Sequence, residues 1–401
     1  MPELPMMPRR AMLRSLAGAG ALALGVTACS DSTDSPGSSG TTAPGSSPPA
    51  TSGGTGTVPE PAVSARRFGA EWDSHVRTFM SWPAATGIWG DDLPAVREDI
   101  ARVARAIAAT EPVVLLARPD QADAARRAVG ADVDVVPMQV DDLWARDTVP
   151  VFVEEAGTVH GVDFNFNGWG DKQSHEHDAR VAREVSAKYG IPLDRTWLVA
   201  EGGSFETDGV GTLMVTESSI VNDNRNPGRT RQQIEDELER VLGVTKVIWF
   251  EGVRNQDITD AHVDSLARFV APGVVLLDKA FPGEPADSWS RSADQARTVL
   301  RDATDARGEP IRVVDLPQPD PERMTAPPGD DFVSSYVNFF IGNRAVFLPR
   351  FGDKAADDRA RGILRDHFPT RDVVMVRIDA IAAGGGGIHC ATHDQPGTPP
   401  A

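Results

Sequence analysis

Helical and strand patterns alternate along most of the chain, and this alternation restricts the fold more than any other feature. Residues 93–109 have the apolar spacing of an amphipathic helix with Pro94 in its first turn, and the apolar run 113–117 predicts a strand. The same pairing is predicted five more times, at 122–129 and 133–136, 179–189 and 197–200, 231–242 (closed by Gly243) and 247–250, 293–303 and 311–316, and 355–367 and 373–378. Two strand pairs with tight turns are predicted at 266–277 and 337–348. Without a Gly-rich dinucleotide fingerprint, these units indicate a repetitive α/β architecture and argue against a nucleotide-binding sheet.

The first 60 residues have a different composition. Arg9 and Arg10 precede a short apolar run at 16–26, and the run ends in Val26-Thr27-Ala28-Cys29, which resembles a twin-arginine export signal closed by a lipoprotein box. The run is well short of the roughly 20 residues that span a bilayer. We therefore expect a signal peptide at 1–29 with lipidation of Cys29, a Ser/Thr/Gly/Pro tether at 30–60, and a single folded catalytic domain at 61–401. This organisation predicts an exported protein that is anchored to the cell membrane by lipid.

The net charge limits the classes of partner that the protein can bind, and the cysteine content limits its disulfides. The formal net charge is -18, which argues against nucleic acid or an anionic membrane surface and favours cationic ligands. The chain has 2 cysteines, so acylation of Cys29 would leave Cys390 as a single thiol with no intrachain disulfide. A lone thiol in an exported protein requires a reason.

That thiol follows a run of glycines. Gly384 to Gly387 remove every Cβ just ahead of Ile388-His389-Cys390, so a substrate can approach the backbone and the chain can adopt positive φ angles. Such a loop can present a nucleophile, but it can also be a flexible loop beside an inert buried thiol. The other polar segments decide between these interpretations.

Polar and charged residues gather at predicted strand ends, where scaffolds usually hold catalytic groups. Four segments share this property: 144–148 (Trp-Ala-Arg-Asp-Thr), 201–204 (Glu-Gly-Gly-Ser), 257–264 (Asp-Ile-Thr-Asp-Ala-His-Val-Asp) and 384–390. Further segments at 71–75, 80–83, 166–172, 224–228, 335–339 and 351–353 accompany them in a fixed order. Taken together they resemble the agmatine deiminase and bacterial peptidylarginine deiminase family, guanidine-modifying enzymes of the pentein superfamily. The resemblance covers nearly the whole mature chain and implies a five-bladed α/β propeller of pseudo-fivefold ββαβ repeats with its site on the axis.

Several positions depart from the family's usual residues. Gly387 stands where the family commonly has Asn, and His393 and Asp394 replace part of a Gln-rich tail. Ile258 stands where agmatine-type members often carry an acid, which is closer to the peptidylarginine deiminase-like branch.

The chemistry of a guanidinium agrees with the residues in these segments. Two carboxylates are needed to hold its N–H groups, and Asp147 and Asp264 are the candidates. Cys390 as a thiolate would attack the central carbon, His262 would move protons and Glu201 would orient the imidazole. His262 and Asp264 are two residues apart, so an extended segment would place both side chains on one face with Cα atoms about 7 Å apart. This reaction requires no cofactor and no metal.

The sequence leaves open which chemical group the substrate carries at the end opposite the guanidinium. Agmatine would offer an ammonium for Asp257 or Asp260, whereas free arginine or an arginine peptide would offer a carboxylate or amides. The predicted substrate contacts are Trp144, Asp147, Asp257, Asp260 and Asp264. We expect agmatine, with peptidylarginine as the alternative, and self-association is left open.

Two other functions compete with a deiminase. A metallohydrolase is suggested by His389 and His393 around Cys390, and by the neighbouring His175 and His177, but the spacing matches none of the usual zinc signatures. A solute-binding lipoprotein is suggested by the tether and the acidic charge. We interpret other histidines, such as His160 and His367, as surface or packing residues.

Overall fold

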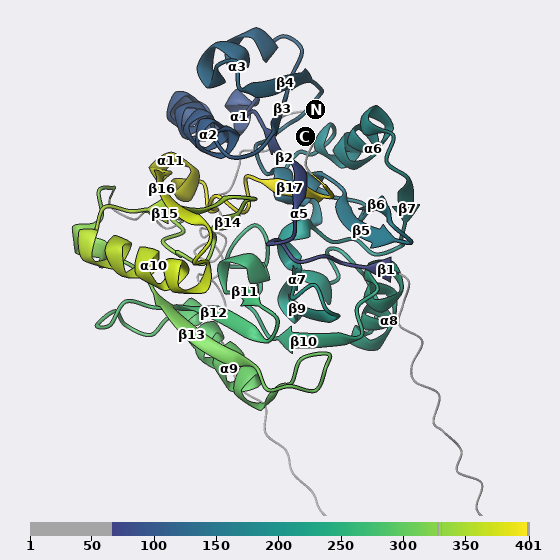
Figure 1. Cartoon of the computed structure of the whole chain (residues 1–401), viewed down its shortest axis with the longest axis vertical. Coiled ribbons are helices and arrows are strands. Elements are labelled where there is room, and N and C mark those ends of the chain that lie inside the picture. Colours follow the sequence, from purple (N-terminus) through teal and green to yellow (C-terminus); the bar gives the residue numbers. More distant parts are fainter. Residues whose placement is uncertain (1–65, 327–328, 330, 399–401) are drawn as a thin grey trace, which may run out of the picture. The chain divides into compact units, whose positions relative to one another are not determined.

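The computed structural model describes residues 66–326, 329 and 331–398. The expected signal peptide and tether at 1–60, including Cys29, lie outside these residues. Within the described part the chain forms a mixed α/β fold with five separate sheets (Figure 1), which confirms the α/β part of the fold prediction. None of the helices described is long and apolar enough to cross a membrane.

Four of the sheets share one connectivity, in which an antiparallel strand pair is followed by a helix and by a third strand parallel to its neighbour. The first two units consist of β5 (Val151–Glu155), β6 (Thr158–Asp163), α6 (Asp178–Tyr189) and β7 (Leu193–Arg195), and of β8 (Glu206–Thr207), β9 (Thr212–Thr216), α8 (Arg231–Leu242) and β10 (Lys246–Phe250). The third consists of β11 (Ala267–Ala271), β12 (Val274–Lys279), α9 (Ser288–Asp302) and β13 (Arg312–Pro317). The fourth consists of β14 (Phe340–Ile341), β15 (Ala345–Arg350), α10 (Lys354–His367) and β16 (Asp372–Arg377). The short strand β1 (Arg66–Arg67) adds to the edge of β5.

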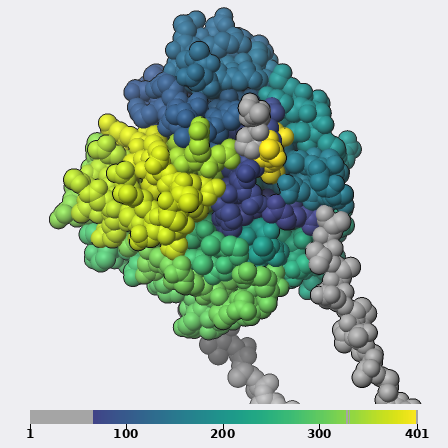
Figure 2. Space-filling model, viewed as in Figure 1, coloured from purple at the N-terminus to yellow at the C-terminus, as the bar shows by residue number. Residues whose placement is uncertain are grey.

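The remaining sheet joins the two ends of the described chain. It contains β17 (His393–Pro396), β2 (His75–Ser81), β3 (Val113–Ala117) and β4 (Val133–Pro137), with α1 (Thr86–Trp89), α2 (Leu93–Ala108) and α3 (Ala122–Val129) in the connections. Strand β17 pairs antiparallel with β2, and His393 lies opposite Phe79. Figure 2 shows purple residues from the start of the described chain beside yellow residues from its end. Cys390 lies three residues before β17, so this pairing fixes the end of the segment that carries it.

Short helices occupy the connections between the larger elements. They are α4 (Ala145–Thr148), α5 (Gly168–Asp171), α7 (Glu217–Ile220) and α11 (Asp379–Ala383), together with the 3-10 turns η2 (Gly90–Asp92), η3 (Gly202–Ser204), η4 (Val263–Ser265) and η5 (Pro321–Arg323). Four of them, α4, η3, η4 and α11, carry or adjoin the polar segments that the sequence analysis singled out.

The longer helices cover the sheets with their apolar faces. In α2 the buried residues include Val96, Ile100, Val103 and Ile107, which recur every three or four residues and form one face. Thr230 caps α8 by accepting a hydrogen bond from Gln233 N, and Gly243 ends this helix with φ of 71°, as its position predicted.

The predicted strand at 197–200 is wrong. The strand of this unit is β7 (Leu193–Arg195), and residues 197–200 lie outside any strand. The amide groups of residues 198–200 donate to loop acceptors and not to a neighbouring strand. Leu198 N donates to Thr196 Oγ1, Val199 N donates to Asn226 Oδ1 and Ala200 N donates to Phe164 O. Leu198 and Ala200 are buried by these loop contacts, whereas Trp197 is exposed. A short apolar run alone does not distinguish such a loop from a strand.

Candidate active site

A cavity of about 250 Å³ brings together most of the predicted site residues. Trp144, Asp147, His262, Asp264 and Cys390 all line it. Asp257 also lines it, whereas Glu201 lies behind His262 and contacts it directly. Four segments that are far apart in sequence therefore meet in this cavity or directly behind it.

Asp147 is held at the cavity by two hydrogen bonds from outside its own short helix. Trp169 Nε1 donates to Oδ2 at 2.9 Å, and Gly203 N donates to Oδ1 at 3.0 Å. The neighbouring Arg146 does not pair with it, since Arg146 donates to Glu71 at 2.7 Å and to Asp394 at 3.2 Å. Burial raises the pKa of Asp147, His262 acts against this, and Glu201 and Asp264 add to the rise.

Three functional side chains converge over Gly203. A Cβ placed there would lie 2.5 Å from His262 Nδ1, 3.0 Å from Asp147 Oδ1 and 3.2 Å from Asp264 Oδ2. These distances are too short for a side chain, so glycine is required by the close approach of the three groups. The predicted extended segment for His262 and Asp264 is wrong, because residues 263–265 form the 3-10 turn η4. The turn nevertheless directs both side chains to the cavity.

His262 is paired with carboxylates on both ring nitrogens. Its Nε2 lies 3.1 Å from Glu201 Oε2, and its Nδ1 lies 3.8 Å from Asp147 Oδ1. Burial alone would lower the pKa of His262, but Asp147, Glu201 and Asp264 raise it. Burial would likewise raise the pKa of Glu201, but Arg225 and His262 lower it. The pair therefore favours an imidazolium beside a carboxylate, which is a proton donor held in one orientation.

Asp264 stays ionised next to the thiol. Its Oδ2 lies 2.8 Å from His389 Nδ1 and 3.4 Å from Cys390 Sγ. Burial would raise its pKa, but the hydrogen bond and charge of His389, with His262 and Arg268, lower it to about 2. A carboxylate and a thiol thus face the cavity together, which is suited to holding and attacking a cationic carbon centre.

The glycine run is required by packing around the thiol. A Cβ on Gly386 would lie 2.3 Å from the ring of Trp144, and a Cβ on Gly387 would lie 2.5 Å from Asn338 Oδ1. Cys390 itself is 9% exposed. The run therefore seats Cys390 between an aromatic ring and an amide, a cause that the sequence analysis did not consider.

The residues at the departing positions 393 and 394 support the site from behind. Asp394 pairs with Arg146, the neighbour of Asp147, and His393 Nδ1 lies 2.9 Å from Arg146 O. Burial, with the charge of Arg146, lowers the pKa of His393 to about 3, so its imidazole is neutral. Both residues thus hold the segment that carries Asp147.

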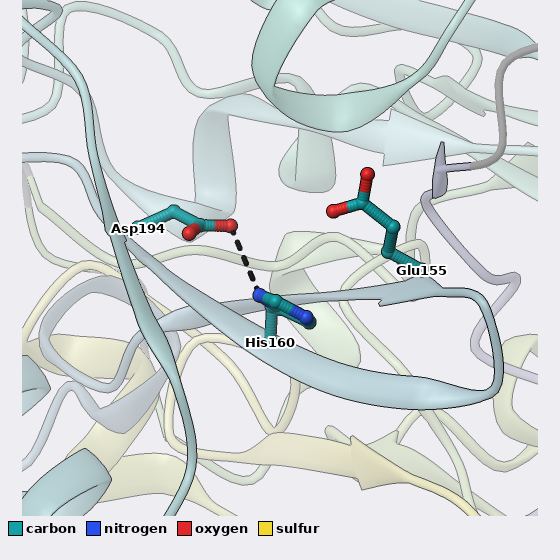
Figure 3. A group of neighbouring side chains, drawn as sticks. All are labelled: Glu155, His160 and Asp194. Atoms are coloured by element: carbon teal, nitrogen blue, oxygen red, sulfur yellow. Dashed lines mark ion pairs between the residues drawn. The ribbon is translucent and has the colours of Figure 1, made fainter.

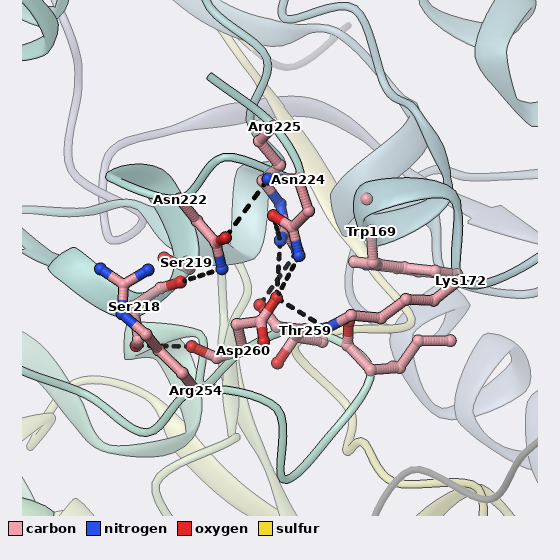
Figure 4. Close-up of polar contacts among 12 residues, drawn as sticks. Trp169, Lys172, Ser218, Ser219, Asn222, Asn224, Arg225, Arg254, Thr259 and Asp260 are labelled. Atoms are coloured by element: carbon pink, nitrogen blue, oxygen red, sulfur yellow. Dashed lines mark hydrogen bonds and ion pairs between the residues drawn. The ribbon is translucent and has the colours of Figure 1, made fainter. Parts of the chain in front are cut away.

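Asp260 does not reach the cavity, and its predicted role as a substrate contact is wrong. It is fully buried, and Figure 4 shows donors surrounding it. Lys172 Nζ donates to Oδ2 at 2.6 Å, Arg225 Nη1 at 2.9 Å and Asn224 Nδ2 at 3.0 Å. With these partners the carboxylate has no capacity left for a substrate ammonium.

The surroundings of Asp260 explain its position. Asp260 and Ala261 have φ angles of 59° and 64°, a left-handed conformation that costs free energy in residues other than glycine. Asn255 N donates to Asp260 Oδ1 at 2.8 Å, and Ala261 N donates to Asp257 Oδ1 at 2.9 Å. The two aspartates therefore hold the turn that leads into His262, and Asp257 in addition lines the cavity.

Several contributors were missed by the sequence analysis. Arg225 joins Glu201 to Asp260, Trp169 orients Asp147, His389 orients Asp264, and Asn338 contacts Cys390. Trp169, Arg225 and Asn338 lie in segments that carried the family resemblance, but nothing in their spacing indicated which residues they would meet.

The histidines do not form the metal site considered for a hydrolase. His389 faces Asp264 and Glu71, whereas His393 faces a backbone carbonyl. Among the described residues, one group brings three potential ligand atoms within 4.8 Å of one another, namely Glu155, His160 and Asp194 (Figure 3). Arg66 Nη2 already pairs with Glu155 at 2.8 Å and with Asp194 at 2.6 Å, so a guanidinium supplies the positive charge there.

Comparison with known proteins agrees with this arrangement. Residues 67–396 match the family of Porphyromonas-type peptidyl-arginine deiminases, and the chain belongs to this family. It is 39% identical over 350 residues to the agmatine deiminase of Stutzerimonas stutzeri, covering 82% of this chain and 94% of the relative. It is 35% identical over 358 residues to the agmatine deiminase of Medicago truncatula, covering 82% and 95%. The solved agmatine deiminase of Enterococcus faecalis superposes with a TM-score of 0.77 at 30% identity, covering 83% of this chain and 96% of that one.

The contacts of Asp260 predict a structural role that can be measured. Asp260→Asn would leave Lys172 and Arg225 buried without a full countercharge, so we expect the free energy of unfolding to fall by about 3 kcal/mol in urea titration. Asp302→Asn, at an exposed position ending α9, is the matched control and should leave the unfolding midpoint unchanged. An Asp260→Asn protein as stable as the control would contradict the assignment.

Proposed function

We propose that this protein is a guanidine deiminase that hydrolyses agmatine to N-carbamoylputrescine and ammonia. The observation that carries the proposal is the placement of Cys390 Sγ beside the Asp264 carboxylate, in one cavity with Asp147 and His262. The relatives named agmatine deiminase at 35–39% identity support the same chemistry.

The proposed reaction uses these groups in two stages. Asp147 and Asp264 hold the guanidinium N–H groups by charge-assisted hydrogen bonds. The Cys390 thiolate forms an S–C bond to the central carbon. His262 then donates a proton to one terminal amino nitrogen, and the C–N bond breaks as that nitrogen leaves as ammonia. Water, deprotonated by His262, then adds to the carbon and the S–C bond breaks. The products are the ureido compound and the restored thiolate.

The walls of the cavity favour a substrate with a second positive charge. No Lys or Arg is among the described residues that line it, whereas the acids that line it include Asp257, Glu284 and Asp287. A negative cavity attracts the ammonium of agmatine and disfavours the carboxylate of free arginine. Ile258, at the position where agmatine-type members often carry an acid, is buried in the core and does not line the cavity. Its apolar side chain therefore leaves the acids that line the cavity unchanged.

Peptidylarginine deimination is the second candidate. The family to which residues 67–396 belong is described by that activity, and an exported enzyme would meet peptides. In that case the same groups would convert a peptidyl arginine to citrulline.

The fold and the cellular location are also proposed in more detail. Five sheets, four of which repeat the same connectivity, with β17 joining the end of the described chain to its start, support a closed five-bladed propeller of the pentein type. The Arg9-Arg10 signal and Cys29 support export and lipid anchoring at the cell membrane.

Substrate preference tests the proposed function. Agmatine should be turned over with a kcat/KM about ten- to a hundred-fold above that of free arginine, because only agmatine carries a second cation into the acidic cavity. Cys390→Ala should abolish ureido formation, and Cys29→Ala, the control at the other cysteine, should keep it. Faster turnover of a peptide with a C-terminal arginine than of agmatine would favour the second candidate, and no ureido product from any guanidine would overturn both.

The location is tested by fractionation of cells. Cys29→Ala should move the protein from the membrane fraction to the soluble extracytoplasmic fraction, since the acylated residue is lost. Arg9-Arg10→Lys-Lys should leave the protein inside the cell. A Cys29→Ala protein that still sediments with membranes would show that lipidation of this residue is not the anchor.

A further inference from the structure

Asp278 is a buried acid that lines the cavity and is bonded only to neutral donors. It is 9% exposed and is the next-to-last residue of β12. Its Oδ1 accepts from Ser335 Oγ at 2.7 Å, and its Oδ2 accepts from Gln318 Nε2 at 2.6 Å. The neighbouring Lys279 pairs instead with Asp315 at 2.8 Å, and no Lys, Arg or His in the described part of the chain forms an ion pair with Asp278. Burying a carboxylate without a cation is unfavourable, so its place in a cavity wall points to a ligand.

The ionisation of Asp278 responds to this environment. Burial raises the pKa of Asp278 to about 7, Ser335 and Gln318 act against the rise, and Asp287 adds to it. A cation bound beside the group would favour its ionised form. Each oxygen accepts one of the two hydrogen bonds and retains capacity for another, so a charge-assisted bond to an ammonium can be added without displacing either donor.

Most other acids that line the cavity have a positive partner or contact with solvent. Asp147 and Asp264 belong to the thiol end and lie beside histidines. Glu284 and Asp287 are exposed, so water can solvate their charges. Asp278 is buried like the first pair but has none of their cationic contacts.

Asp257 was predicted to contact the substrate, but its carboxylate is used by its own turn. Its Oδ1 accepts from Ala261 N at 2.9 Å, and its Oδ2 accepts from Thr259 Oγ1 at 2.5 Å. Lys172 Nζ already lies against this segment, at 3.3 Å from Asp257 O. Asp257 is also partly exposed, as is Asp331, the remaining acid of the cavity wall. Neither is a buried charge that requires a ligand cation.

The segments that flank the thiol also position Asp278. Its backbone N donates at 2.8 Å to the carbonyl of Leu266, which directly follows η4. Ser335, the donor to Oδ1, comes three residues before Asn338, whose Nδ2 lies 3.1 Å from Cys390 Sγ. The thiol and Asp278 are therefore fixed by the same loops in one cavity.

The rest of the cavity suits a short alkyl chain. Trp144, Trp289 and Phe332 line it, and its volume of about 250 Å³ admits a small ligand. Aromatic rings offer apolar surface to methylene groups, whereas an ammonium that leaves water needs an anionic partner. A molecule with a guanidinium at one end and an ammonium at the other matches these walls.

We propose that Asp278 binds the distal ammonium of the substrate and thereby restricts this site to guanidines that carry an amine on a short alkyl chain. The carboxylate of free arginine would be repelled there, and the amides of a peptidylarginine would gain no ion pair. The link to turnover rests on the proposed deiminase function. Binding of a cation at Asp278 does not.

The test compares agmatine with butylguanidine, which has the same four-carbon chain without the amine. The wild type should have the higher kcat/KM for agmatine. Asp278→Asn should lower the ratio of the two kcat/KM values about ten- to a hundred-fold, because an ion pair in a cavity of low polarity is lost. Asparagine has the same size and can still accept from Ser335, so we expect the fold to persist. Asp302→Asn, at the exposed end of α9, is the control and should keep the ratio.

Gln318→Lys tests the same cation site from another segment. The new ammonium would lie beside Asp278 Oδ2, where Gln318 Nε2 now donates, and would compete with that of agmatine, so the ratio should fall again. A wild-type ratio in both variants would overturn the role of Asp278, even if agmatine is hydrolysed. A fall in Glu284→Gln alone would assign the ammonium to the exposed loop and would overturn it as well. If Asp278→Asn does not fold, Gln318→Lys decides the question.

Calorimetric binding separates this inference from the proposed function. In full-length Cys390→Ala protein, agmatine should bind more tightly than butylguanidine, and adding Asp278→Asn should remove most of this difference in Kd. If the wild type hydrolyses no guanidine but the difference is present and is lost with Asp278, the cation site stands and the proposed reaction is overturned. Equal Kd values for the two ligands, in a protein whose wild type hydrolyses agmatine, would overturn the cation site alone.

Discussion

Most of this structure depends on the buried carboxylate of Glu71, which binds side chains and backbone from four distant segments. Arg146 donates to it at 2.7 Å, Arg268 at 2.6 Å and Ile341 N at 2.9 Å, and His389 Nε2 lies at 3.1 Å. Burial alone would raise the pKa of Glu71, but Arg268, His389 and Arg146 hold it well below its ordinary value. A buried charge without partners is strongly destabilising. The four segments that supply these partners must therefore all be in place around Glu71 for the fold to be stable.

The same interaction sets the geometry of the candidate active site. His389 touches Glu71 through Nε2 and Asp264 through Nδ1, so one imidazole links the central carboxylate to the group beside the thiol. Arg146 precedes Asp147 in sequence, and its pairing with Glu71 fixes the short segment that places that aspartate in the cavity. Both carboxylates that would hold a guanidinium are therefore positioned by one buried network, and Cys390 follows His389 directly. This explains why a cavity built from distant loops can be well ordered.

Much of the architecture could be predicted because it depends on local periodicity. The apolar spacing in α2 and the cap and terminal glycine of α8 determine where those helices lie. Asp147, His262, Asp264 and Cys390 were identified because their segments resemble those of a guanidine-modifying family, whose substrate needs those side-chain types, and the structure brings them together. Residues 197–200 were misassigned because side-chain acceptors, which periodicity does not reveal, take their amide hydrogens.

The remaining errors concern contacts between distant residues. Asp260 was expected at the substrate because it is acidic and close to His262, but Lys172, 88 residues earlier, neutralises it. Asn338 was overlooked because its contact with Cys390 spans 52 residues. Local sequence patterns do not indicate contacts between residues so far apart in the chain. The side chains that support the site can therefore be identified only from the three-dimensional structure.

The central claim is that Cys390 attacks the guanidinium carbon and carries it as a covalent intermediate. The most direct measurement is the intact mass of the enzyme after turnover of agmatine is quenched with acid within milliseconds. The account predicts a transient species heavier by agmatine less one ammonia, mapped to Cys390 by peptide analysis and decaying to free enzyme as ureido product appears. Steady formation of ureido product while no such adduct is found at any quench time would contradict it.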